Sequence, residues 1–151
     1  MENLNIVKQA LMPVADQLPG LLENHWDEVA KNKHLMKLSP QVEKYRKLEA
    51  EGCLVCLFAR SGEVIVGYSI NIITNHLHYS GLVISQNDVI YVHPAFRTSS
   101  LGLRLIKATE DACRDAGSQL MLMHGKEGTP FAKILPRKGY GVQDIIFSKE
   151  L

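Results

Sequence analysis

The stretch from Asp88 to Gly117 limits the possible folds more than any other part of the chain. It opens with the β-branched and aromatic run DVIYV, which Pro94 stops because a proline cannot continue a ladder of backbone hydrogen bonds. A polar loop follows, and apolar residues then recur at helical spacing until Gly117, a residue typical of helix ends. These apolar residues are Leu101, Leu105, Ala108 and Ala112. The pattern predicts a strand, a loop and a helix in direct succession.

The loop between this strand and this helix is rich in hydrogen-bond donors. Its members are Arg97, Thr98, Ser99, Ser100 and Gly102. Backbone N–H groups there converge at the positive end of the helix, where phosphate is stabilised, and Arg97 adds a forked side-chain donor. Gly102 lets a ligand approach the backbone closely. The loop predicts a pyrophosphate site; the alternative is that Ser99 or Ser100 only caps the helix and Arg97 is a surface charge.

The other elements complete one domain over residues 1–151. Predicted helices cover 18–29, 40–51, 101–116 and 129–137, and predicted strands cover 4–10, 53–60, 64–73, 82–85, 88–92, 119–124 and 140–151. The order is helices, an antiparallel meander and then one strand–helix–strand unit. It predicts an α/β (α+β) fold with a mixed sheet flanked by helices.

Charge and cysteine content exclude several classes of protein. The 17 Lys and Arg residues nearly balance the 16 Asp and Glu residues, so no global positive field favours nucleic acid as a partner. The start MENLNIVKQALMPVADQ lacks the basic end and apolar run of a signal peptide, and no stretch reaches membrane-spanning length. An odd number of cysteines, three, fits a reducing compartment. We therefore expect a cytoplasmic protein with no membrane partner.

Two short motifs carry metal-ligating residues without predicting a metal site. Cys53 and Cys56 form a CxxC, but strand alternation sends positions three apart to opposite faces, so they could not readily hold one ion. His76 and His78 form an HxH that could add two ligands. The geometry of the cysteines argues against zinc, and core packing explains them better.

Residues 97–102 resemble the acyl-CoA signature (Q/R)xxGx(G/A) of the GNAT superfamily of N-acetyltransferases. Ser100 replaces the usual first glycine of that signature. The order of elements is similar over roughly the whole chain, and the pieces HLHY at 76–79 and DVIYVHPAFR at 88–97 resemble small acetyltransferases of bacteriophage genomes.

The resemblance implies a GNAT-like sheet with a V-shaped opening between two central parallel strands, one ending near Val92 and the other near His124. Acetyl-CoA would lie in the opening. Main-chain groups of Tyr91 and Val92 would hydrogen-bond the pantetheine arm like an added strand. The loop from Arg97 to Leu103, Leu101 included, would hold the pyrophosphate.

The reaction implied is direct attack of a primary amine on the thioester, which needs a base and benefits from an acid. Candidate bases are Asp88 and His124, with Glu127 as a third option; each also has a structural explanation, as a strand-end or solvated group. The position of the family's usual acidic tyrosine holds Leu135. We therefore expect Tyr140 or Tyr91, or water, to serve as the acid, although Tyr140 also suits core packing.

Several alternatives stay open at this stage. His25, Trp26 and Glu28 could line the acceptor site or simply anchor a core helix. A non-catalytic acyl-CoA-binding module would keep the loop without turnover, and an interaction protein with a capped helix would not bind CoA at all. The acceptor could be a protein lysine, a polyamine, an aminoglycoside-like molecule or a modified nucleobase amine. The final strand suggests pairing across a homodimer.

Overall fold

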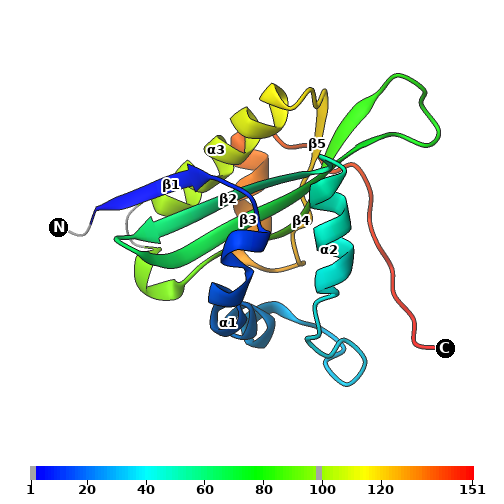
Figure 1. Ribbon diagram of the computed structural model, residues 1–151. Helices are drawn as coiled ribbons and strands as arrows, with labels where there is room; N and C mark the ends of the chain where they lie inside the picture. Colours follow the sequence, from blue (N-terminus) through cyan, green and yellow to red (C-terminus); the bar gives the residue numbers. More distant parts are fainter. Residues whose placement is uncertain (1–2, 98–99) are drawn as a thin grey trace.

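The strand–loop–helix succession expected around residues 88–117 forms the centre of the fold (Figure 1). The structure is a computed structural model that describes residues 3–97 and 100–151. The strands are β1 (Leu4–Lys8), β2 (Leu54–Ser61), β3 (Val64–Asn75), β4 (Val83–Val92) and β5 (Leu120–Leu122). The helices are α1 (Pro19–Val29), α2 (Val42–Ala50), α3 (Leu101–Asp115) and α4 (Pro130–Ile134), with 3-10 turns η1 (Met12–Gln17), η2 (Pro94–Phe96) and η3 (Leu135–Lys138).

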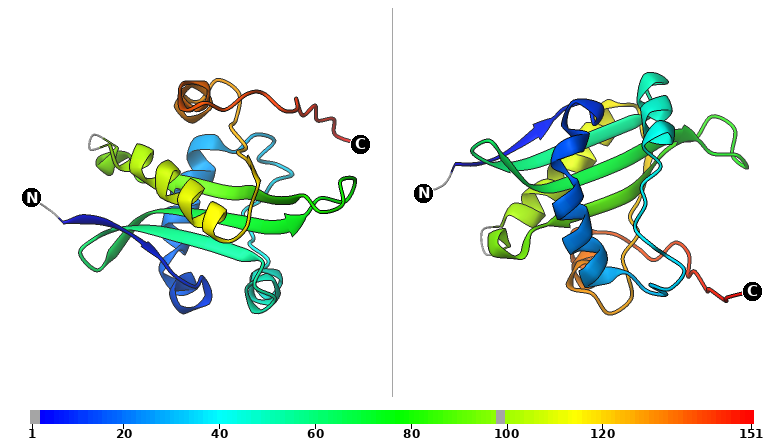
Figure 2. Two further views of the ribbon diagram at one scale, coloured as in Figure 1. Left: turned by 90° about the horizontal axis from the view of Figure 1, so that it is seen from above. Right: turned by 60° about the horizontal axis from the view of Figure 1, so that its bottom comes forward.

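The strands form one sheet in chain order, and helices cover both of its faces. Neighbouring strands are antiparallel except for β4 and β5, which are parallel because α3 connects them. Figure 2 shows α1 and α2 on one face and α3 on the other. The predicted mixed, mostly antiparallel sheet flanked by helices is confirmed.

Alternation along the strands divides the core into two layers. Phe58, Tyr68 and Tyr91 pack under α1 with apolar residues of η1 and α1. The intervening strand residues pack under α3, where Leu101 and Leu105 have no exposed surface. Each layer follows from the period of two in the strands and the 3.6-residue period of the helices.

The two apolar runs expected at 82–85 and 88–92 belong to one strand that contains a β-bulge. Asn87 faces Asn71 of β3 and Val89 faces Ile70, so Asp88 is an extra residue without an opposite partner. As a result Asp88 and Val89 both lie on the side of α1 and α2. The bulge explains why the alternation breaks between the two runs.

The close approach of β3 to the end of β4 depends on a glycine. A Cβ placed on Gly67 would lie 2.8 Å from the carbonyl oxygen of Tyr91 and 3.1 Å from a methyl group of Val92. Real Cβ atoms essentially never show a contact as short as 2.8 Å, and a contact of 3.1 Å is tighter than most. Gly67 therefore allows the last residues of β4 to pack against β3.

The prediction of a final strand over 140–151 is wrong, because residues 141–151 form no regular structure. The apolar side chains of this segment are 72–89% exposed at Val142, Ile145, Ile146 and Phe147. A strand requires a neighbour for its backbone groups, and in the described part of the chain none lies beside this segment. The expected buried strand at 119–124 is shorter too, and Leu120 is 40% exposed.

Candidate functional site

The pairing of β4 with β5 stops halfway along β4. The last facing pair is Gln86 and Leu122, whereas β4 continues to Val92. In the described residues, no strand pairs with that edge of β4 beyond Gln86. The bulge at Asp88 lies at the point where the pairing ends. The result is an unpaired strand edge whose last five residues, 88–92, lead directly to the loop before α3.

The first turn of α3 has open backbone donors. Ser100 is the residue before the helix, and its side chain makes no capping hydrogen bond, so it does not act as the side-chain cap considered from the sequence. The N–H groups of Leu101, Gly102 and Leu103 belong to the helix end that lacks intrahelical partners. Apart from the adjoining residues and the backbone of α3 itself, no atom of the described residues lies within 4 Å of the position a Cβ would take on Gly102. Thr98 and Ser99 lie outside the described residues.

Ser100 has a left-handed backbone with φ of +33°. A non-glycine residue adopts that conformation at a cost of roughly 1 kcal/mol. This position is the one where the (Q/R)xxGx(G/A) signature has its first glycine, so the geometry gives a physical reason for that preference. Ser100 adopts this left-handed conformation in spite of its energetic cost.

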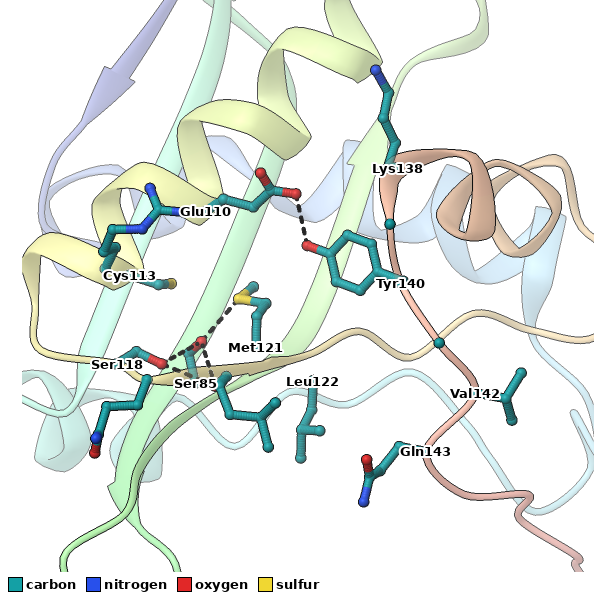
Figure 3. Close-up of a pocket in the computed structure, with 15 residues that line it drawn as sticks. Ser85, Glu110, Cys113, Ser118, Met121, Leu122, Lys138, Tyr140, Val142 and Gln143 are labelled. Atoms are coloured by element: carbon teal, nitrogen blue, oxygen red, sulfur yellow. Dashed lines mark hydrogen bonds between the residues drawn. The ribbon is translucent and has the colours of Figure 1, made fainter.

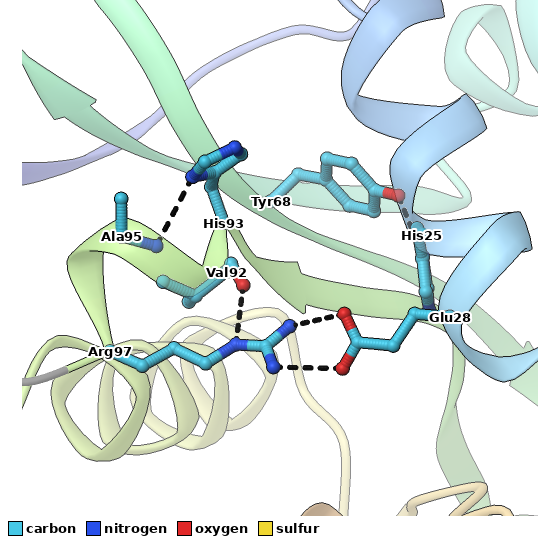
Figure 4. A network of polar contacts seen from close by, with 7 residues as sticks. All are labelled: His25, Glu28, Tyr68, Val92, His93, Ala95 and Arg97. Atoms are coloured by element: carbon cyan, nitrogen blue, oxygen red, sulfur yellow. Dashed lines mark hydrogen bonds and ion pairs between the residues drawn. The ribbon is translucent and has the colours of Figure 1, made fainter.

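Arg97 turns back from the loop toward α1 (Figure 4). Its two terminal nitrogens lie 2.8 and 2.7 Å from the carboxylate oxygens of Glu28, and its Nε donates to the carbonyl of Val92 at 2.8 Å. The hydrogen bond from Arg97 lowers the pKa of Glu28, and the same bond raises the pKa of Arg97. One side chain thus joins the end of β4 to α1.

His25 lies beside this pair, inside the same network (Figure 4). Its Nδ1 is 2.7 Å from the hydroxyl of Tyr68, and its ring stacks on Tyr91 with 4.6 Å between ring centres and 15° between planes. Burial lowers the pKa of His25, the positive charges of Arg97 and Lys126 add to that effect, and the carboxylate of Glu28 opposes it. His25 is therefore held neutral at neutral pH.

Asp88 is held by a residue that the sequence did not single out. The hydroxyl of Tyr45, on α2, donates to Oδ2 of Asp88 at 2.5 Å. Burial, followed by the hydrogen bond to Asp88, raises the pKa of Tyr45. The only sequence signal for Tyr45 was its place on a predicted helix, which suits a core residue equally well.

His124 and Tyr140 occupy different surroundings from Asp88. Nε2 of His124 lies 3.4 Å from the side-chain nitrogen of Gln86, close to the last β4–β5 pair. Tyr140 donates to Glu110 of α3 at 2.9 Å, and burial, ahead of this bond, raises its pKa. Asp88 bonds to α2 on the opposite face of the sheet from α3, so the structure does not bring Tyr140 to it.

Tyr140 lines a cavity of about 470 Å³ between β5 and residues 139–143 (Figure 3). Among its lining residues, Oγ of Ser85 donates to the sulfur of Met121 and accepts from Oγ of Ser118. Residues of α3 and Ser85 of β4 also line the cavity, but none of residues 88–92 does. It is thus separate from the unpaired edge of β4.

No group of three or more potential metal-ligating side chains occurs in residues 3–97 and 100–151. Cys56 is buried in the core, where burial raises the pKa of its thiol to about 12, and Cys53 precedes β2. Among the described helices, none is long and apolar enough to cross a bilayer.

Comparison with known proteins identifies a family that the chain matches. Residues 21–133 match the sequence model of the Acetyltransferase (GNAT) family. No curated protein sequence matches the chain.

Solved structures share the fold at low sequence identity. An aminoglycoside acetyltransferase from an uncultured soil metagenomic sample, in complex with sisomicin, has a TM-score of 0.75 at 19% identity, covering 98% of this chain and 96% of that one. A ribosomal-protein-alanine N-acetyltransferase from Brucella melitensis biovar Abortus 2308 has a TM-score of 0.68 at 19% identity, covering 99% and 97%. AAC(6')-Iy, in complex with the bisubstrate analogue CoA-S-monomethyl-acetylneamine, has a TM-score of 0.64 at 18% identity, covering 99% of both chains.

The environment of His25 predicts a pH dependence of stability. The pKa of His25 in the folded protein is below the value of about 6.5 expected in the unfolded chain. As the pH falls below that value, the unfolded state therefore binds more protons than the folded state. Stability is therefore lost on acidification. Between about pH 7.5 and pH 5.5, the melting temperature of the wild type should fall more than that of His25→Asn. The control is His78→Asn, which changes an exposed histidine. If the melting temperatures of the wild type and His25→Asn depended equally on pH, the lowered pKa of His25 would be contradicted.

Proposed function

The chain belongs to the GNAT acetyltransferase family, and we propose that it holds acetyl-CoA between the unpaired edge of β4 and the first turn of α3. Membership makes it an acyltransferase that uses acetyl-CoA to acetylate a primary amine. The observation that supports the location is the end of the β4–β5 pairing at Gln86, with β4 continuing to Val92 at the loop before α3.

The two ends of this region suit the two polar parts of the co-substrate. An extended arm with amide groups can add to the edge at residues 88–92 as a further strand does, through Tyr91 and Val92. A pyrophosphate suits the N–H groups of Leu101, Gly102 and Leu103, which have no intrahelical partner at the positive end of α3. Ser100 borders that end, and the roles assigned to Thr98 and Ser99 stay predictions.

In this proposal Arg97 can bind either of two anions, the carboxylate of Glu28 or a phosphate of the ligand. In the structure its fork binds Glu28, and its side chain is 40% exposed. A phosphate near the loop offers an equivalent bidentate partner. We propose that Arg97 contributes to phosphate binding by exchanging Glu28 for the ligand.

The chemistry requires the amine to lose a proton. As the nitrogen attacks the carbonyl carbon, the C–N bond forms, the C–S bond breaks, the sulfur leaves with the electron pair, and a proton leaves the nitrogen. We propose Asp88 as the base, directly or through water, because it lies at the bulge where the opening begins, and Tyr45 holds its carboxylate in place. His124, beside Gln86, is the second candidate, and Tyr140 as the acid stays a prediction.

The acceptor is proposed to be a small or peptide-borne primary amine. Two of the similar structures are named for aminoglycosides or for the alanine of a ribosomal protein. A screen should therefore contain sisomicin, a peptide with N-terminal alanine and a polyamine. A cytoplasmic location and kinship with bacteriophage acetyltransferases stay predictions of the sequence.

We also propose that the segment 144–149 pairs with its counterpart in a second copy. Its backbone makes no hydrogen bond to other backbone groups in the described part of the chain, and its apolar side chains are exposed. An antiparallel pairing about a two-fold axis between Ile146 and Phe147 places Asp144 opposite Lys149 at both ends. Charge complementarity thus favours the second copy over another partner.

Acetyl-CoA binding tests the location. Gly102→Trp fills the open space over the first turn of α3 and should weaken binding at least about 100-fold in isothermal titration, because the backbone donors become inaccessible. Gly20→Trp is a matched control, since Gly20 is also the second residue of a helix with open space above it. Unchanged affinity in Gly102→Trp would place the pyrophosphate elsewhere.

The role of Asp88 predicts a defect in kcat. Asp88→Asn should lower kcat by about 10² or more with little change in the affinity for acetyl-CoA, since only proton transfer is lost. Tyr45→Phe should lower kcat by a smaller factor. Asp115→Asn, at the far end of α3, controls for the change of charge. Release of CoA thiol reports the rate, and a kcat for Asp88→Asn within threefold of the wild type would exclude Asp88 as the base.

The dimer predicts a mass of twice 16.9 kDa in light scattering after size exclusion. Asp144→Lys should yield monomers, because it opposes Lys149 of the second copy, and the double change Asp144→Lys with Lys149→Asp should restore the dimer. A monomeric wild type would rule out the pairing, as would a dimer insensitive to the charge reversal.

A further inference from the structure

The α3 face of the sheet contains a buried polar network in the middle of an apolar layer. Its members are Ser69, Asn71, Asn87 and Thr109, which are joined by hydrogen bonds and are each at most 1% exposed. Burying such groups is unfavourable unless their hydrogen bonds are made. In the described residues, no buried side-chain nitrogen or oxygen lacks a partner. Every buried polar side-chain atom of this network therefore has a hydrogen-bond partner.

Asn87 bridges the two sides of the bulge in β4. Its Nδ2 lies 3.2 Å from the carbonyl oxygen of Val89, across the extra residue Asp88, and 3.4 Å from the carbonyl oxygen of Ile70 on β3. A bulge disrupts the regular ladder at this point. One N–H of this amide donates to Asn71, so the other is shared between the carbonyls of the facing pair Ile70 and Val89, next to the bulge.

Asn71 holds Asn87 in this orientation. Oδ1 of Asn71 accepts from Nδ2 of Asn87 at 2.8 Å, the shortest contact of that nitrogen. The amide nitrogen of Asn71 donates to the carbonyl of Val55 at 3.0 Å and to Oγ of Ser69 at 3.0 Å. Groups from β2, β3 and β4 therefore fix the pair.

The network also reaches α3 through a contact that does not involve the bulge. Oγ1 of Thr109 lies 2.9 Å from Oγ of Ser69, and both residues are fully buried. Ser69 Oγ also accepts from Asn71 and Asn87, but loss of the bond from Thr109 leaves the direct Asn71–Asn87 hydrogen bond in place. Thr109 thus offers a control for stability alone.

We infer that Asn87, held by Asn71, is a positioning residue that fixes the bulge and thereby the binding edge of β4. The bulge directs Asp88 toward Tyr45 and places Tyr91 on the α1 face. A regular strand would turn Tyr91 to the other face, because side chains alternate with a period of two. The inference rests on the proposed location of acetyl-CoA, whose pantetheine arm would pair with the edge that the bulge sets.

The test compares two replacements within the network. Asn71→Leu with Asn87→Leu replaces both partners by apolar groups, which avoids leaving one amide unpaired. Thr109→Val removes only the bond to Ser69. The readouts are the melting temperature, the acetyl-CoA dissociation constant, and the backbone NOE register of β3 and β4, which shows whether Ile70 faces Val89 or Asp88.

The double variant should lose the offset register and bind acetyl-CoA at least about tenfold more weakly, whereas Thr109→Val should melt at a lower temperature with affinity within about threefold of the wild type. A double variant that keeps Ile70 opposite Val89 would overturn the inference, whatever its affinity. A shifted register with unchanged affinity would overturn it as well.

If the double variant does not fold, a measurement on the wild type tests whether the side chain of Asn87 is held in place. The two side-chain amide protons of Asn87 should exchange slowly with solvent, since the group is buried and bonded to Asn71 and Val89. Exchange at the rate of an exposed amide would overturn the inference. A wild type that does not bind acetyl-CoA would refute the proposed location, while register and exchange would still report on the bulge.

Discussion

The early end of the pairing between β4 and β5 is the constraint on which the rest of the site depends. Parallel strands normally satisfy each other's backbone groups along their shared length. Here three facing pairs are made, ending at Gln86 and Leu122, and β4 then runs on with its outer edge free. Because a free edge offers a row of donors and acceptors, it provides a template for an extended ligand. The same strand leads into the loop before α3, so in the proposed arrangement the edge and the helix end bind two parts of one ligand.

Interactions on both faces of the sheet keep that edge in place. On the α1 side, Arg97 joins Glu28 to the carbonyl of Val92, and on the α2 side Tyr45 holds Asp88. On the α3 side, the Asn71–Asn87 pair spans the bulge. Helices distant in sequence thus meet at five residues of β4, which links the packing of the whole domain to the geometry of the opening.

Much of the fold could be predicted because it follows from local periodicity. The strand–loop–helix unit from Asp88 to Gly117 has a proline, a donor-rich loop and a terminal glycine in the expected places, and α3 ends as expected. The bulge at Asp88, the partner Tyr45 and the Glu28–Arg97 pair were not predicted, since each depends on contacts between residues far apart in the chain. The prediction of a final strand is wrong for a related reason, since a run of β-branched and aromatic residues does not form a strand without a neighbouring strand.

Amide hydrogen exchange of β4 in the presence of saturating acetyl-CoA tests the central claim most directly. If the co-substrate adds to the free edge, outward-facing amides within residues 88–92 should become protected, as should the first amides of α3, while the β3-facing amides of β4 should change little. Protection confined to the cavity lined by Tyr140, or an unchanged edge despite saturable binding, would contradict the account.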